Sequence, residues 1–249
     1  MSAPPRALEV SARTGLLEAP DSALAGWTRL RVREDGAGHI VVVFRLPDDA
    51  TDSTVAAFLR AFDTARSTPA PVIAMGGPEI GDSGEVVLQL APGRYLLGCM
   101  TKGEDGHRHA SSGEARLLTI SGSVTSEPPP NLADSATRVG LTEFAFTTSD
   151  GWKAGARMLR VENTGQQDHQ LRLERFKPGM DLQQWLNADD PDQLVIPIAG
   201  VARIGPGMVA YLPVDLEPGS YLLYCLIPDS ATGALHVGMG MMRTVEVVR

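Results

Sequence analysis

The feature that most constrains how this chain folds is an internal duplication. APGRYLLGCM matches EPGSYLLYCL, LRVREDGAGHIVVVFRL matches LRVENTGQQDHQLRLERF, and HASSGEARLLTI aligns without a gap with HVGMGMMRTVEV. A repeated sequence predicts a repeated structure, so we expect two tandem domains of one fold. Both cysteines and four of the five histidines fall at matched positions. The matched pairs are Cys99 with Cys225, His39 with His169, and His109 with His236.

The boundary between the repeats is predicted near a proline-rich segment. SGSVTSEPPPNLADSA (121–136) combines small polar residues with three consecutive prolines, which favours a partly extended linker. We therefore predict one domain at 1–123 and another at 124–249, with the linker at about 121–136. A chain of 249 residues suits this division, because domains of ~120 residues can each bury a core.

Short runs rich in Val, Ile and Leu predict mostly β-structure in each half. One helix is expected after the second run of each half, at 53–66 with Ser53 as its N-cap and at 181–190. Many short strands with a crossing helix predict an all-β fold of two tandem Greek-key β-sandwiches, each with a short helical insertion. The expected strands are 30–34, 39–46, 85–90, 94–100 and 115–120, then 157–162, 169–176, 208–214, 220–226 and 243–248.

The composition argues against two classes of partner. A net charge of −8 and a pI near 5.1 do not suit nucleic acid, whose phosphates require a basic face. No run approaches the ~18 apolar residues that a membrane span needs. The first residues, MSAPPRALEVSARTG, lack the apolar region of a signal peptide. The chain could therefore be cytosolic, or it could be the mature form of an exported protein.

The second half resembles the cupredoxin family of blue copper proteins. VENTGQQDHQLRL is similar to the segment that carries the family's first histidine ligand, and GSYLLYC to the strand that delivers its cysteine. HVGMGMMRTVEV is similar to the closing loop and last strand. The resemblance implies a copper ion bound by His169, Cys225, His236 and, as a weak axial ligand, Met241. It also implies export to the periplasm or outside the cell, and a redox or copper-exchange protein as partner.

One spacing departs from the family's pattern. Ten residues (LIPDSATGAL) separate Cys225 from His236, whereas the family usually places them much closer together. Pro228-Asp229 and Thr232-Gly233 are typical of a turn, so the insert could loop out and return the histidine to the site. The same insert could mark a relic that binds another metal or none.

The same register predicts a weaker site in the first half, at His39, Cys99 and His109. Glu114 stands where the second half has its axial methionine, and a carboxylate is a poor match for Cu(I). His107 and His109 lie in GEDGHRHASSGE, a polar, Gly-rich stretch that is typical of an exposed loop. We therefore expect the first half to be mostly a structural copy.

Catalysis is not expected. Five histidines cannot supply the trinuclear cluster of a multicopper oxidase within one chain, and no nucleophile elbow, phosphate loop or zinc-protease motif occurs. The leading prediction is an electron-transfer or copper-binding protein with one mononuclear site. Two alternatives stay open. The first is a Cu(I) carrier that uses the Met-rich loop of Met239, Met241 and Met242. The second is a duplicated β-sandwich that serves in interactions without a metal.

Overall fold

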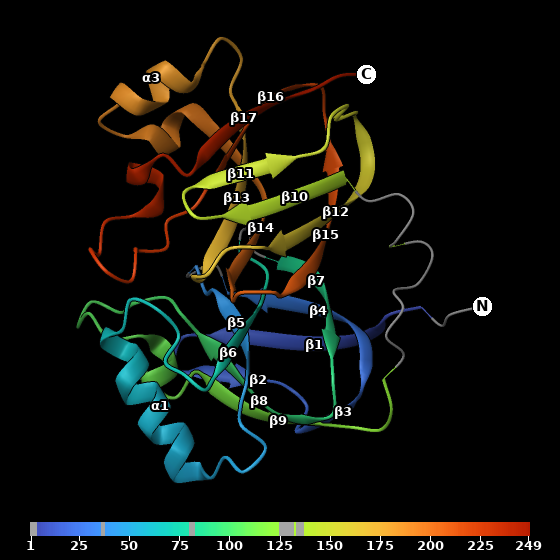
Figure 1. Ribbon diagram of the computed structural model, residues 1–249, viewed down its shortest axis with the longest axis vertical. Coiled ribbons are helices and arrows are strands. Elements are labelled where there is room, and N and C mark those ends of the chain that lie inside the picture. The colour runs from blue at the N-terminus through green and yellow to red at the C-terminus, as the bar shows by residue number, and fades with distance from the viewer. Residues whose placement is uncertain (1–3, 36–37, 80–82, 125–131, 133–136) are drawn as a thin grey trace.

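Strands make up most of the regular structure in this computed structural model (Figure 1). The structure describes residues 4–35, 38–79, 83–124, 132 and 137–249. The first half contains β1 (Arg6–Arg13), β2 (Leu16–Glu18), β3 (Ser22–Leu24), β4 (Gly26–Glu34), β5 (Val41–Arg45), β6 (Ile73–Gly76), β7 (Ser83–Leu90), β8 (Gly93–Cys99) and β9 (Ala115–Ser121). The second half contains β10 (Thr137–Thr142), β11 (Ala145–Thr148), β12 (Gly155–Asn163), β13 (His169–Phe176), β14 (Val195–Ile204), β15 (Val209–Leu216), β16 (Gly219–Tyr224) and β17 (Met242–Val247). The helices are α1 (Asp52–Thr64) and α3 (Leu182–Asn187), with short 3-10 helices η1 (His109–Ser112), η2 (Pro191–Leu194) and η3 (His236–Met239).

Two β-sheets run through the molecule, and both continue from one half into the other (Figure 1). One seam pairs β7 with β15, where Leu88 lies opposite Ala210, and the other pairs β6 with β14, where Met75 lies opposite Ile204. From these seams outward the order is β7-β4-β1-β2 against β15-β12-β10-β11, and β6-β5-β8-β9 against β14-β13-β16-β17, with β3 added beyond β9 and without a counterpart among the described strands of the second half. The matching orders and antiparallel seams relate the halves by an approximate twofold axis. The chain is thus two tandem β-sandwiches that share their sheets.

The predicted strands and helices are present, and one predicted cap is wrong. The expected runs coincide with β4, β5, β7, β8 and β9 and with their counterparts β12, β13, β15, β16 and β17. The N-cap of α1 is Thr51 rather than Ser53, because the Thr51 side chain accepts the Thr54 N–H while the Thr54 hydroxyl accepts the Thr51 N–H. Asp181 caps α3 in the same reciprocal way, with Gln184.

The predicted linker at about 121–136 lies largely outside the described residues. β9 ends at Ser121 and β10 begins at Thr137, so the described strands of each half lie on their own side of it. The division of the chain at 123/124 stays a prediction.

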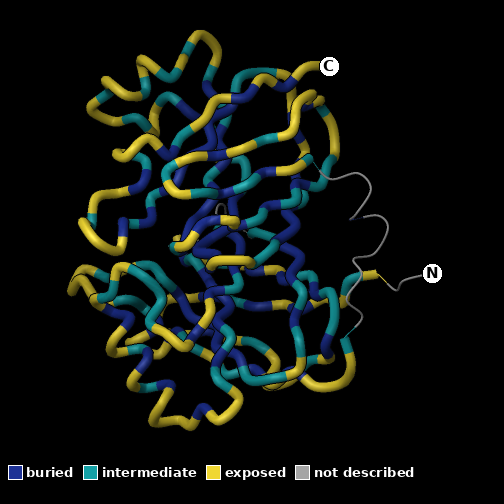
Figure 2. Tube along the Cα trace, viewed as in Figure 1, coloured by how far each residue is buried: buried dark blue, intermediate teal, exposed yellow. Residues whose placement is uncertain are grey.

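The apolar core lies between the two sheets and crosses the seam between the halves (Figure 2). One cluster of buried side chains contains Val86 and Leu88 of the first half together with Leu171 and Leu212 of the second. The two sandwiches therefore share a continuous core, and burial of apolar surface favours their association. Among the described residues, no helix has both the length and the apolar character required to cross a membrane.

Candidate metal centres

Three of the four ligands predicted in the second half lie together. His169 opens β13, Cys225 follows β16 and His236 begins η3, and all three residues are completely buried. The Nδ1 atoms of the two imidazoles are 3.1 Å apart, and Cys225 Sγ lies 3.5 Å from His236 Nδ1. The Gln170 N–H donates to the same sulfur at 3.3 Å. One thiol and two Nδ1 atoms thus converge on one point inside the sandwich.

Met241, the fourth predicted residue, stands beside this cluster. Its N–H donates to the carbonyl of His236 at 2.9 Å, and its carbonyl accepts the Cys225 N–H at 3.3 Å. The residue is fully buried and belongs to the same apolar cluster as Cys225. Its backbone therefore joins the cysteine strand to the histidine turn.

The ten-residue insert folds into a small hairpin that returns the chain to the site. Pro228 bridges Leu235, and the His236 N–H then donates to the carbonyl of Ile227 at 2.9 Å. The two ends of the insert are thereby held together, and the Val237 N–H donates to the carbonyl of Cys225 at 2.8 Å. The long spacing is compatible with a close contact between Cys225 and His236.

Asp229 organises this hairpin. Its Oδ1 accepts from Gln167 Nε2 at 2.9 Å, and its Oδ2 accepts both the N–H and the hydroxyl of Thr232 at 2.7 Å. These hydrogen bonds, above all the one from Gln167, hold the pKa of the Asp229 carboxyl at about 2. Because only the ionised carboxylate accepts all of them, the pKa in the folded hairpin is lower than in a free chain.

We expect the hairpin to open in acid. A depressed folded pKa gives stability that is complete above the ordinary carboxyl pKa of about 4. That stability is lost as the pH falls through about 2. Hydrogen exchange of the amides in 229–234 should show constant protection down to about pH 4 and a loss below it. Asp229→Asn should remove this pH dependence; the same acid transition in the variant would contradict the assignment.

A segment of the first half supports the start of β13. Asp168 Oδ2 accepts the N–H and the hydroxyl of Thr68 and the Arg203 guanidinium, each at 2.7 Å. Arg203 also donates to the carbonyl of Arg66, and Arg66 donates to the carbonyl of Ala231 in the insert hairpin. The chain that follows α1 therefore contacts both the residue before the first histidine and the loop before the second.

The turn between β10 and β11 covers the two imidazoles. The ring of Phe144 packs edge-on against His236, with centroids 5.3 Å apart. Glu143 Oε1 lies 3.9 Å from His169 Nε2. Phe144 has a φ of 61°, a left-handed conformation that is uncommon for a bulky residue and is often found at functional sites. Sequence reasoning missed both residues, since nothing in LTEFAF indicates what the turn covers.

Burial keeps the metal-free ligands uncharged. It raises the pKa of the Cys225 thiol to about 12. Burial, followed by the neighbouring His236, lowers the pKa of His169 to about 4, and burial also lowers the pKa of His236. Neutral imidazole is the form that binds metals. Both Nε2 atoms are buried without a hydrogen-bond partner among the described residues.

The first half holds a second cluster at the matched positions. His39 Nδ1 lies 2.8 Å from Glu114 Oε2 and 3.6 Å from Cys99 Sγ. His109 Nδ1 lies 3.3 Å from the same carboxylate oxygen and 3.8 Å from the same sulfur. Burial raises the pKa of the Cys99 thiol to about 11. His107 points elsewhere and pairs with Asp63 at the end of α1.

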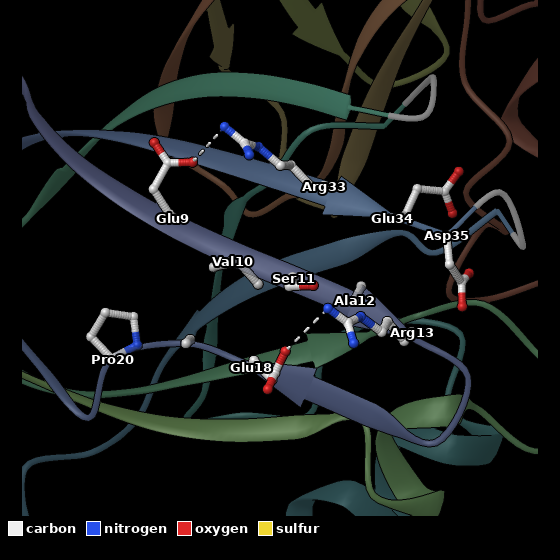
Figure 3. Close-up of a pocket in the computed structure, with 11 residues that line it drawn as sticks. Glu9, Val10, Ser11, Ala12, Arg13, Glu18, Pro20, Arg33, Glu34 and Asp35 are labelled. Carbon is white, nitrogen blue, oxygen red and sulfur yellow. Dashed lines mark ion pairs between the residues drawn. The ribbon is translucent and has the colours of Figure 1, made fainter.

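A charged groove at the described surface contains neither cluster. It runs beside β1 and β4 and is lined by charged side chains (Figure 3). Within it Glu9 pairs with Arg33 and Glu18 pairs with Arg13. At its rim Asp35 Oδ1 lies 3.3 Å from His39 Nε2. The groove therefore approaches the first-half cluster only through Asp35, on the Nε2 side of the His39 ring.

Comparison with known proteins finds likenesses in structure alone. No protein-family model matches the chain, and no curated protein does. Reduced auracyanin from Roseiflexus castenholzii is 22% identical, with a TM-score of 0.32, over 47% of this chain and 99% of its own. A multicopper oxidase is 13% identical, with a TM-score of 0.29, over 97% and 88%. A copper-containing nitrite reductase from Thermus scotoductus SA-01 is 11% identical, with a TM-score of 0.27, over 97% and 61%.

The two halves place the same types of residue at matched positions of the fold. In each half a histidine lies at or before one central strand, a cysteine ends or directly follows the neighbouring strand, and a second histidine opens the turn that leads to a strand next to it. That is the order expected from the sequence resemblance. Each half therefore places its cysteine and two histidines in the order that the sequence resemblance predicts.

Proposed function

We propose that the second-half cluster binds one copper ion and that the protein transfers electrons without catalysing a reaction. The observation that carries this proposal is the convergence of His169 Nδ1, His236 Nδ1 and Cys225 Sγ in a completely buried position. Two imidazoles and a thiolate with a weak thioether suit copper, which would supply a one-electron couple between Cu(II) and Cu(I). Met241 is the proposed thioether ligand.

The charge of the ligands supports this assignment. Cys225, as a thiolate, is the only anion among the four proposed ligands, so Cu(I) would leave the buried site neutral and Cu(II) would leave one positive charge. A single buried charge is tolerable when an acidic group lies near. Glu143, whose carboxylate is partly exposed 3.9 Å from His169 Nε2, provides such a group.

The arrangement of the methionines favours electron transfer over a Cu(I) carrier. Met239 is exposed, whereas Met241 is buried in the core cluster of Cys225. Met242 packs against a different apolar cluster, the one that contains Tyr224. The three side chains therefore occupy separate environments rather than forming one Met-rich site. The partner in electron transfer would be another redox protein. We also propose that the protein is exported from the cytoplasm.

Copper titration tests the proposed function. A Cys99→Ser variant, freed of metal with a chelator, should bind one equivalent of Cu(II) in the second half with an intense visible band from thiolate-to-copper charge transfer. Ascorbate should bleach the band and ferricyanide should restore it. The double variant Cys99→Ser/Cys225→Ser should show no band.

Three other outcomes would each contradict the proposal. Tight Cu(I) binding without the band would support a carrier. Failure to retain copper in either oxidation state after gel filtration would leave a metal-free interaction module. A band that persists in the double variant would place the copper elsewhere.

A further inference from the structure

The first-half cluster differs from the second in one residue. Glu114 occupies the backbone position of Met241, because each follows a left-handed glycine after its 3-10 turn. The Glu114 N–H donates to the carbonyl of His109 at 3.0 Å, and its carbonyl accepts the Cys99 N–H at 3.0 Å. These are the same two hydrogen bonds that Met241 makes in its own half. The fold therefore delivers a carboxylate where the other half delivers a thioether.

The side chain of Glu114 is fixed in the cluster. It is 2% exposed, and its Oε1 accepts the Gly15 N–H at 2.8 Å. Its Oε2 is the oxygen that lies near His39 Nδ1 and His109 Nδ1. One oxygen is thus held by the backbone while the other faces the thiol and the imidazoles.

The four atoms are spaced as metal ligands are. A tetrahedral ion with ligand distances of about 2.0–2.3 Å has ligand-to-ligand edges of about 3.2–3.8 Å. Three separations fall in that range: 3.6 Å from Cys99 Sγ to His39 Nδ1, 3.8 Å from Cys99 Sγ to His109 Nδ1, and 3.3 Å from His109 Nδ1 to Glu114 Oε2. A further separation, 2.8 Å from His39 Nδ1 to Glu114 Oε2, would have to lengthen slightly, and all four atoms lie within 4.8 Å of one another.

We propose that His39, Cys99, His109 and Glu114 form a second metal site, which holds a divalent first-row cation. The charge balance selects the divalent state. A thiolate and a carboxylate carry two negative charges into a buried position, and a divalent ion neutralises both. A monovalent ion would leave one negative charge buried. Without a metal, Glu114 Oε2 would have to accept hydrogen bonds from both imidazole Nδ1 atoms. The Cys99 thiol would remain packed against the same two rings.

The surroundings provide a route for the ion and an acidic group near the outer nitrogen of His39. The His109 side chain is 21% exposed, and the turn above it carries Gly15, where the second half carries the covering ring of Phe144. Asp35 Oδ1 lies 3.3 Å from His39 Nε2, on the side of the ring away from the cluster. The two groups do not hydrogen-bond in this structure. A carboxylate that accepts the outer N–H of a histidine orients that histidine on a metal.

Cobalt and zinc binding test the proposal, on a chain whose second-half site has been disabled. The Cys225→Ser variant, freed of metal, should bind one equivalent of Co²⁺ with a thiolate-to-cobalt band in the near ultraviolet, and should retain one equivalent of Zn²⁺ through gel filtration. Adding Cys99→Ser should abolish both. Failure to bind either ion would overturn the proposal, whatever copper does in the second half.

Variants of Glu114 test its role as the fourth ligand. Glu114→Gln keeps an acceptor for the Gly15 N–H but loses the charge, so its affinity for Zn²⁺ should fall at least tenfold. Glu114→Met installs the residue of the other half and should raise the ratio of Cu(I) to Zn²⁺ affinity at least tenfold. Unchanged values would remove Glu114 from the site. If neither variant folds, His109→Gln at the exposed edge of the cluster should also weaken Zn²⁺ binding at least tenfold, and unchanged binding would overturn the site.

Discussion

Replacing Asp168 with alanine is expected to lower the free energy of unfolding by about 3–5 kcal/mol, the usual cost of leaving a buried charge unpaired. The side chains of Asp168 and Arg203 are each 7% exposed, with an oxygen-to-nitrogen distance of 2.7 Å. Asp168→Ala would leave the guanidinium buried without its carboxylate and would also free the Thr68 N–H. Denaturant unfolding of the metal-free chain measures the loss.

Two further variants separate the ion pair from general damage. Glu18→Ala breaks an exposed pair with Arg13, at 3.8 Å, and should cost no more than about 1 kcal/mol. The double variant Asp168→Leu/Arg203→Leu removes both charges and should recover much of the loss. An Asp168→Ala chain as stable as the Glu18→Ala chain would show that the buried pair of Asp168 and Arg203 adds nothing to stability.

Most of the sheet structure could be predicted from the sequence, and so could β7 and β15 of one seam, but β6 and β14 of the other seam could not. Runs such as VVVFR in β5 are unmistakable because each is short, apolar and β-branched. β14 was missed because Pro197 and Gly200 argue against a strand, and the structure accommodates the proline beside an irregular register opposite Glu174. β6, IAMG, is too short to stand out. Because β6 and β14 pair with each other across the two halves, the sequence does not predict that the sheets continue from one half into the other.

The sequence predicts those residues of the candidate site that occupy matched positions of the internal repeat. His169, Cys225 and His236 come together as expected, because the repeat and the resemblance fix their places on the strands. The sequence could not decide whether the long insert returned His236, since that depends on Asp229 binding Gln167 from another loop. Glu143 and Phe144 reach the site from a turn distant in sequence, and no local pattern predicts such contacts.

Gly77→Ala is expected to destabilise the protein by about 3 kcal/mol or more, because overpacking against backbone has no flexible side chain to absorb it. A Cβ on Gly77 would lie 1.9 Å from the carbonyl oxygen of Val41. The Gly77 carbonyl also accepts the Ala202 N–H across the seam, at 2.8 Å. The strand that follows His39 would have to move away from the seam. Gly238→Ala, where an added Cβ meets nothing within 4 Å, is the control and should change stability by no more than about 0.5 kcal/mol.

Because the halves are related by an approximate twofold axis, the close approach of a glycine to a backbone carbonyl recurs in the second half. A Cβ on Gly200 would lie 2.6 Å from the carbonyl oxygen of Leu171, the residue of β13 that matches Val41. Gly200→Ala should therefore also lower the denaturant midpoint, and Gly77→Ala should disturb the first-half cluster more, since Val41 pairs with Cys99. In Zn²⁺ titrations of the Cys225→Ser chain, Gly77→Ala should weaken binding more than Gly200→Ala does. Equal effects on binding would mean that the seam transmits the strain to both halves alike.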